Sequence, residues 1–168
     1  MLPKIKTILY ATGLGSGAPY IFRYAMTLAL QHQASIVAVH AIEPLSTFGQ
    51  SLVEQYISHE QSTEMHRQAR ESFKIKLNAR IEKLLAEECA NAPECRKLVS
   101  DIRIVDGYSA QVILAAANDC AADLIIMGAR RHSTIGEVML GGTTRKVLHS
   151  ANQPVLVVRV PSEFLTEG

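Results

Sequence analysis

The stretch Asp123–Leu148, DLIIMGARRHSTIGEVMLGGTTRKVL, contains a strand, a loop with glycines and the start of a helix. Its first part, Asp123–Gly128, is short and apolar, which is typical of a strand buried on both faces. Its last part predicts a helix over Gly142–Ser150, with Val147 and Leu148 directed inward. This order indicates a sheet whose strands are joined by helices.

The same alternation of short apolar strands and amphipathic helices runs through the rest of the chain. Further strands are predicted over Lys4–Ala11, Ala34–Ala41, Val99–Asp106 and Pro154–Val160. Further helices are predicted from Ala18 onward with Ser16 as N-cap, from Ser58 to near Asn91, and over Ser109–Cys120. The pattern predicts an α/β fold, an open doubly wound five-stranded parallel sheet with helices on both faces.

The length of 168 residues predicts one domain, 1–168. A stripe along the long second helix is predicted to face the core: Met65, Ala69, Phe73, Leu77, Ile81 and Leu84. Before that helix, Ile42–Ile57 has mixed composition, and it is predicted to be a long connection that leaves the sheet after the second strand.

Charge and cysteine content restrict the class of partner. Seventeen basic and sixteen acidic side chains leave a net charge of +1, so neither nucleic acid nor an anionic membrane is favoured as a partner. No apolar run approaches the roughly 18 residues of a membrane helix. The three cysteines have spacings of neither a disulfide framework nor a paired-cysteine zinc site. We therefore expect a cytoplasmic protein.

The segment after the first strand, Gly13–Ala18 (GLGSGA), formally fits the glycine pattern of dinucleotide-binding loops. Such loops need an acidic residue at the end of the second strand, where His40 and Ala41 stand, and Glu43 follows late. The alternative is that these glycines serve a tight turn and close helix packing. A dinucleotide-dependent enzyme is therefore ranked third, after the two functional hypotheses given below.

The loop after the fourth strand offers an anion site. Gly136–Thr143 has the spacing of a P-loop, but Gly142 replaces the lysine that such loops require. Gly141, Gly142, Thr143 and Thr144 instead present amides and hydroxyls at the start of a helix, where anions bind. Arg130 and Arg131 could add positive charge.

Several motifs together resemble the universal stress protein family over Lys4–Val160. They are KTILYAT, VAVHAIEP, the DG after the third strand, ADLIIMGARRHS, the LGG turn and NQPVLVVRV. The resemblance implies an adenine nucleotide alpha hydrolase-like sheet of order 3-2-1-4-5, usually a homodimer, and in many members a site for ATP or another adenine nucleotide.

Three positions depart from the nucleotide-binding signature that the resemblance implies. Arg131 stands where the family has a second glycine, and Gly142 where it has a serine or threonine. Gly13 stands where nucleotide-binding members usually carry an aspartate. Arg131 is either a charge-assisted phosphate clamp or part of a solvated basic loop over an empty crevice.

The leading hypothesis is a regulatory or stress-protective protein that binds an adenine nucleotide, with magnesium able to bridge the phosphates. The predicted binding residues are Ala11, Thr12, Gly13, His40, Ala41, Met127, Gly128, Arg130, Arg131, Gly141, Gly142, Thr143 and Thr144. No acid and base pair is assembled by the sequence, so no catalytic or metal-binding residue is assigned, and at most slow ATP hydrolysis is expected. The alternative is a dimeric interaction protein that binds no nucleotide and contacts an unknown protein partner through Ile42–Ile57.

The last strand predicts the dimer. In the order 3-2-1-4-5 it lies at an edge, and the sequence VLVVRV would leave that edge apolar. Pairing with the same strand of a second copy would cover both edges, so a homodimer is predicted through Val155, Leu156, Val157, Val158, Arg159 and Val160. The alternative is that the terminal segment PSEFLTEG covers the strand.

Overall fold

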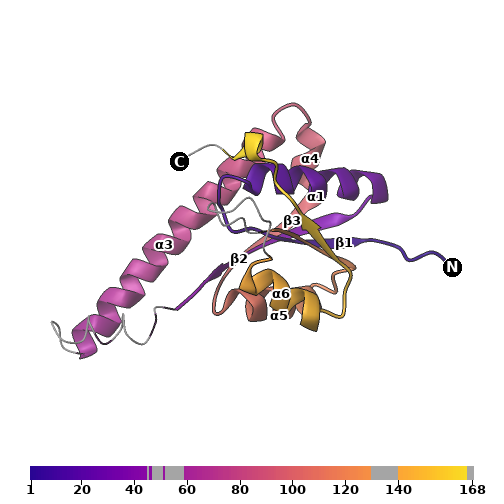
Figure 1. Cartoon of the computed structure of the whole chain (residues 1–168). Coiled ribbons are helices and arrows are strands. Elements are labelled where there is room, and N and C mark those ends of the chain that lie inside the picture. Colours follow the sequence, from indigo (N-terminus) through magenta and orange to yellow (C-terminus); the bar gives the residue numbers. More distant parts are fainter. Residues whose placement is uncertain (45, 47–50, 52–58, 130–139, 166–168) are drawn as a thin grey trace.

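The computed structural model (Figure 1) describes residues 1–44, 46, 51, 59–129 and 140–165. Its strands are β1 (Thr7–Ala11), β2 (Ser35–Ile42), β3 (Val99–Asp106), β4 (Leu124–Gly128) and β5 (Val155–Val158). Its helices are α1 (Ala18–His32), α3 (His59–Glu88), α4 (Pro93–Leu98), α5 (Ser109–Asp119) and α6 (Gly142–Ser150), followed by the 3₁₀ turn η1 (Ser162–Phe164).

The strands form one parallel sheet in the order β3-β2-β1-β4-β5, which confirms the predicted α/β fold and strand order. Strand β1 lies at the centre and pairs with β2 through Ile8↔Ile36 and with β4 through Ile8↔Leu124. Because β1 is covered on both faces, four of its five residues are buried. The chain after β1 runs to β2 on one side, whereas the chain after β4 runs to β5 on the other side. The connections that leave β1 and β4 therefore diverge between these two strands.

Two helical layers enclose the sheet. One core cluster joins alternate strand residues such as Ile8 and Tyr10 to helices α1, α3 and α4. The other joins the intervening residues, such as Leu9 and Ala11, to α5 and α6. Figure 1 shows α1 and α4 on one side of the sheet and α5 and α6 on the other. The two-residue period of the strands thus supplies both cores.

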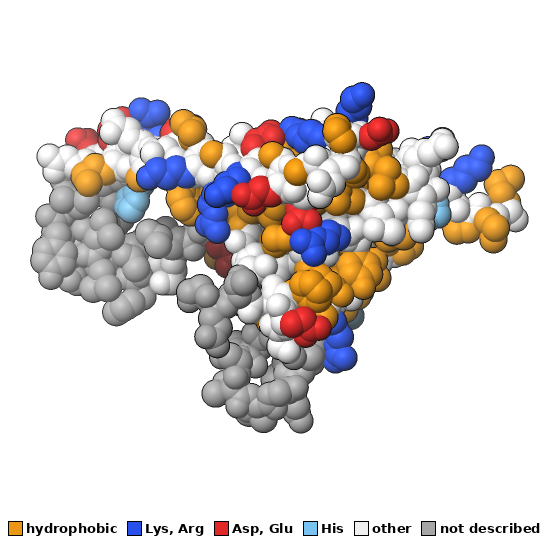
Figure 2. All heavy atoms as spheres, turned by 90° about the horizontal axis from the view of Figure 1, so that it is seen from above, with side chains coloured by type: hydrophobic (Ala, Val, Ile, Leu, Met, Phe, Trp, Pro, Cys, Tyr) orange, Lys and Arg blue, Asp and Glu red, His pale blue; other side chains and the backbone are white. Residues whose placement is uncertain are grey.

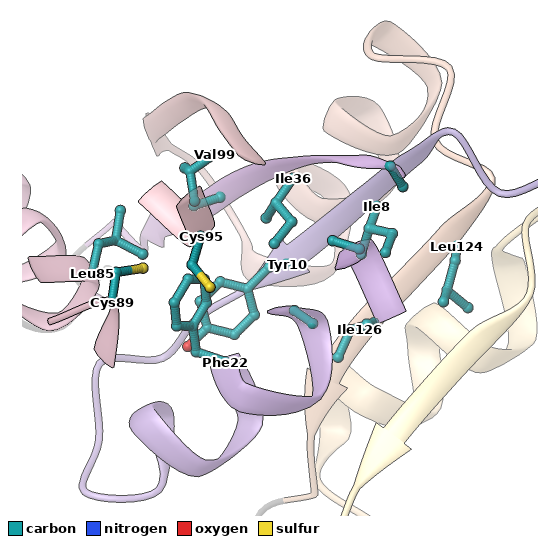
Figure 3. Close-up of a cluster of buried hydrophobic side chains, with 14 of the residues drawn as sticks. Ile8, Tyr10, Phe22, Ile36, Leu85, Cys89, Cys95, Val99, Leu124 and Ile126 are labelled. Atoms are coloured by element: carbon teal, nitrogen blue, oxygen red, sulfur yellow. The ribbon is translucent and has the colours of Figure 1, made fainter. Parts of the chain in front are cut away.

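Tyr10 fixes where α1 begins. Its ring packs against Phe22 with the ring centroids 5.3 Å apart (Figure 3), and its hydroxyl donates to the Ala18 carbonyl oxygen at 3.0 Å. Burial raises the pKa of Tyr10, so the hydroxyl remains a hydrogen-bond donor. The first turn of α1 is therefore tied to the centre of the sheet.

The cysteines are free thiols. Cys89 and Cys95 lie beside Leu85 in the core cluster on the side of the sheet that α1, α3 and α4 cover (Figure 3). Cys120 is partly buried. Burial raises the pKa of the Cys89 thiol, which keeps it protonated and apolar in character. Cys89 and Cys95 therefore act as packing residues.

Several predicted boundaries are wrong by a few residues. Helix α1 is preceded by Gly17 and has no side-chain cap, so Ser16 is not the N-cap. Strand β5 ends at Val158 rather than Val160, and β2 continues to Ile42. The predicted Ser58 start of the long helix lies outside the described residues, and that helix ends at Glu88. Pro93 opens the short helix α4, which the sequence did not predict, because proline fits the first turn of a helix.

The first half of α3 extends beyond the sheet (Figure 1). Met65 and Phe73, predicted to face the core, are 61% and 48% exposed, whereas Leu77 and Ile81 are buried. Only the second half of the helix packs against the core, because the first half lies beyond the edge of the sheet. A smaller difference occurs in α6, where Leu148 is 43% exposed.

Among the described residues, the face seen from above the α1 layer has no region that carries only one sign of charge. Lys and Arg side chains there are interspersed with Asp, Glu and apolar ones (Figure 2). Among the described residues, no helix is both long enough and apolar enough to cross a membrane.

We predict that Gly107→Ala destabilises the fold. Gly107 follows β3 with φ of +146°, and an added Cβ would lie 3.0 Å from Val112 Cγ2. A non-glycine residue in this region costs about 1–3 kcal/mol of unfolding free energy, which urea denaturation can measure. The control is Gly13→Ala, whose Cβ would meet no atom within 4 Å and is expected to change stability by about 0.5 kcal/mol or less. Equal stability of the two variants would contradict the backbone argument.

Candidate functional site

A pocket of about 610 Å³ opens at the carboxyl ends of β1, β2 and β4, a volume suited to a ligand the size of a nucleotide. Its walls also come from the first turns of α1, α5 and α6 and from the segment after β5. The pocket lies where the connections from β1 and β4 diverge, which is where open α/β sheets place ligands.

Every predicted binding residue within the described part of the chain lines this pocket. These residues are Ala11, Thr12, Gly13, His40, Ala41, Met127, Gly128, Gly141, Gly142, Thr143 and Thr144. Arg130 and Arg131 lie outside the described residues. The structure thus brings the described set together, and the role of each residue toward a ligand stays a prediction.

The end of β1 is held by two polar side chains. Buried Thr12 accepts a hydrogen bond at Oγ1 from the amide of Leu14 at 3.1 Å, which supports Leu14 at φ +56°. The Thr12 carbonyl oxygen lies 2.7 Å from His40 Nδ1. Because a carbonyl only accepts, His40 Nδ1 donates to it. His40 therefore braces the loop after β1.

The start of α6 supplies hydrogen-bond donors. Gly141 precedes the helix, no side chain caps its N-terminus, and its first turn contains no acidic residue. The hydroxyl of buried Thr144 donates to the Gly128 carbonyl oxygen at 3.4 Å, which connects this turn to the end of β4. Amides of a first turn have no partner within the helix, and they carry a partial positive charge. This end of the pocket suits an anion.

Glycines determine how much of the pocket is open. A Cβ added at Gly13, Gly15 or Gly142 would meet no atom within 4 Å. At Gly17 and Gly128, by contrast, it would meet Val160 Cγ2 at 2.9 Å and Ile21 Cδ1 at 2.4 Å. Gly17 therefore allows the close packing that the sequence suggested, whereas Gly13 and Gly15 leave free space beside the backbone, and dinucleotide binding by this loop stays a prediction.

Sequence reasoning missed Glu43 and Ser109, which also line the pocket. Glu43 Oε1 accepts hydrogen bonds from the Ser109 amide at 3.1 Å and from its hydroxyl at 2.6 Å. Since β2 ends at Ile42, Glu43 directly follows the strand rather than lying beyond it. A strand boundary placed one residue later would have identified Glu43.

The remaining lining residues that were not predicted are mostly small or apolar. They are Gly15, Ser16, Gly17, Ala18, Ile21, Val39, Ile113, Ala129, Val160 and Leu165. Among the described residues, no group of three His, Cys, Asp or Glu side chains is placed to hold a metal ion.

The predicted dimer strand is an edge strand whose side chains are already partly packed. Val155, Leu156 and Val157 are half-buried, and Arg159 is exposed. Val158 and Val160 are buried within the chain. The described part of the terminal segment turns onto α1, where Phe164 packs against Tyr20 with ring centroids 4.6 Å apart.

The family model described as the universal stress protein family matches residues 4–159. A universal stress protein of Thermus aquaticus is 34% identical over 155 residues, which are 92% of this chain and 98% of that protein. Universal stress protein A homolog 2 of Coxiella burnetii is 28% identical over 166 residues, which are 95% of this chain and 98% of that protein.

Solved structures show the same fold. The structure of MJ0577 has a TM-score of 0.65 and 24% identity, and the match covers 95% of this chain and 99% of that one. A universal stress protein in complex with cAMP has a TM-score of 0.56 and 19% identity, covering 94% of this chain and 98% of that one.

We predict that Thr12→Val destabilises the loop after β1. Valine keeps the volume but leaves the Leu14 amide without its acceptor, which costs about 1–3 kcal/mol of unfolding free energy. Thr12→Ser is the matched control because it keeps the hydroxyl oxygen. Urea denaturation should show a loss for valine and a much smaller loss for serine. Equal losses would contradict the hydrogen-bond argument, because only valine removes the acceptor of the Leu14 amide.

Proposed function

This chain belongs to the universal stress protein family, and we propose that it binds an adenine nucleotide, with ATP as the leading candidate, in the pocket at the strand ends. In this proposal it is a cytoplasmic regulatory or stress-protective protein without efficient catalysis. The observation that carries the proposal is the uncapped start of α6, which opens into a pocket lined by glycines.

The two ends of the pocket favour one orientation of the nucleotide. The amides of Gly142, Thr143 and Thr144 would receive the phosphates, since they supply donors beside the partial positive charge of the helix. Apolar Ala11, Val39 and Met127 line another part of the same pocket and suit a purine ring.

The residues present fit this ligand in space and in chemistry. Open space beside Gly13, Gly15 and Gly142 allows phosphate or ribose to approach the backbone. Glu43 is the one acidic side chain among the described lining residues, so magnesium would be held mainly by the phosphates, with hydroxyl ligands from Thr143 or Thr144. Arg130 and Arg131 lie outside the described residues, and their contribution of positive charge to the phosphates stays a prediction from the sequence, in which Arg131 replaces a glycine of the family signature.

We predict micromolar binding of ATP to nucleotide-stripped protein. Isothermal titration calorimetry with ATP, ADP and AMP, each with and without magnesium, measures it. Affinity should fall as phosphates are removed, because the α6 amides recognise negative charge. Absence of heat at millimolar nucleotide would overturn the proposal. It would favour the alternative of a dimeric interaction protein that binds no nucleotide, which the missing side chain at Gly13 already favours.

We also propose that β5 pairs with the β5 of a second copy. The amide of Ile125 donates to the Pro154 carbonyl oxygen, and the amide of Ala129 donates to that of Val158. Because backbone groups of successive strand residues point in opposite directions, those of Val155 and Val157 face away from β4. Among the described residues β5 pairs only with β4, so this edge can accept another strand.

We predict that Val157→Pro converts the dimer to a monomer. Proline removes an amide that faces the open edge and leaves the β4 pairing intact. Light scattering coupled to size exclusion should show half the mass, with little change in the thermal unfolding midpoint. The control is Val157→Thr, which keeps the amide and should remain dimeric. A wild-type protein that is already monomeric would contradict the proposed interface.

A further inference from the structure

One wall of the pocket is formed by the segment after β5, residues 159–165. Val160 and Leu165 of this segment line the pocket, together with Ala18 and Ile21 of the first turn of α1. All four side chains are apolar, whereas the start of α6 offers backbone donors and hydroxyls. Figure 1 shows the segment, in yellow, passing from β5 to the start of α1. The pocket is therefore bounded on the α1 side by a segment that belongs to no strand of the sheet.

Close contacts hold this segment against α1. The buried side chain of Val160 lies against Gly17, where an added Cβ would meet Val160 Cγ2 at 2.9 Å. The 3₁₀ turn η1 follows, and its last residue, Phe164, packs on Tyr20 with the ring centroids 4.6 Å apart. The turn thus directs neighbouring side chains to different places, Phe164 to α1 and Leu165 to the pocket.

The contact between Phe164 and Tyr20 lies outside the core, and neither residue lines the pocket. Helix α1 buries a different set of residues against the sheet: Ala18, Phe22, Ala25 and Ala29. The ring of Phe164 is 43% exposed. A single aromatic pair of this kind is weak enough to break while the rest of the fold stays intact. The contact therefore adds little to the stability of the sheet, and its main consequence is the position of Leu165.

We propose that residues 160–165 are a wall that retains the bound nucleotide, and that Phe164 is a positioning residue for Leu165. The inference rests on the proposed nucleotide binding. An apolar side chain that covers a ligand gains contact area with it and excludes water, so the loss of that side chain speeds release of the ligand. Val160 is fixed by its packing at Gly17, whereas Leu165 follows the ring contact. Release of the nucleotide would therefore depend on a contact that lies outside the pocket.

The test measures ATP binding to wild-type protein and to Phe164→Ala. Calorimetry gives the dissociation constant, and stopped-flow displacement of fluorescently labelled ATP by excess ATP gives the dissociation rate constant. We expect both constants of Phe164→Ala to rise together, by about threefold or more, because alanine removes the ring contact. The association rate constant should change little. Leu165→Ala should have the same effect, because it removes the side chain that lines the pocket.

Two further variants separate this role from a general effect on α1. Phe164→Tyr keeps the ring and should keep the wild-type dissociation rate. Tyr24→Ala removes a ring that packs on Tyr20 from within α1, with centroids 5.5 Å apart, and Tyr24 does not line the pocket. Tyr24→Ala should therefore bind ATP as the wild type does. In all four variants the thermal unfolding midpoint without nucleotide should change by no more than about 4 °C.

Failure of the inference and failure of the proposed function give different results. If wild-type protein binds ATP, but Phe164→Ala and Leu165→Ala release it at the wild-type rate, the inference is wrong and the proposed function stands. If Tyr24→Ala speeds release as much as Phe164→Ala does, the effect belongs to α1 as a whole and the inference is again wrong. If wild-type protein binds no nucleotide at all, the proposed function itself is wrong.

Discussion

The parallel pairing of β1 with both β2 and β4 is the constraint on which the rest of the structure depends. It buries four of the five residues of β1 and makes β1 the strand from which the chain winds outward in both directions. Parallel strands direct all their carboxyl ends to one edge, so every loop that follows a strand arrives there. The pocket is a consequence of this topology before any side chain is considered.

Small residues keep that edge open. Gly13, Gly15 and Gly142 project nothing into the pocket, while Gly17 and Gly128 allow Val160 and Ile21 to approach. What remains among the described residues is a surface of backbone amides, hydroxyls and short apolar side chains, with His40 and Glu43 beside them. Under the proposed function, such a surface would recognise a ligand by shape and by hydrogen bonds.

The two helical layers differ in how far their helices extend beyond the sheet. Helices α5 and α6 are short, lie against it and begin at the pocket, so their first turns belong to the site. Helix α3 is much longer than the sheet is wide, and ion pairs from Arg70 and Lys74 to Asp106 attach it where β3 ends. Beyond that point its apolar residues have no sheet to pack against.

The sequence by itself determined the fold class, the strand order through its family resemblance, and the residues that follow each strand, because period and glycine placement are local properties. It mispredicted the Ser16 cap, the burial of Met65 and Phe73, and the relation of Glu43 to β2. Each of these errors concerns the point at which a helix or strand begins or ends, or how far the sheet reaches along a helix. Only the tertiary structure placed Glu43 against Ser109, residues 66 apart in the chain, because a helix start and a strand end meet there through folding alone.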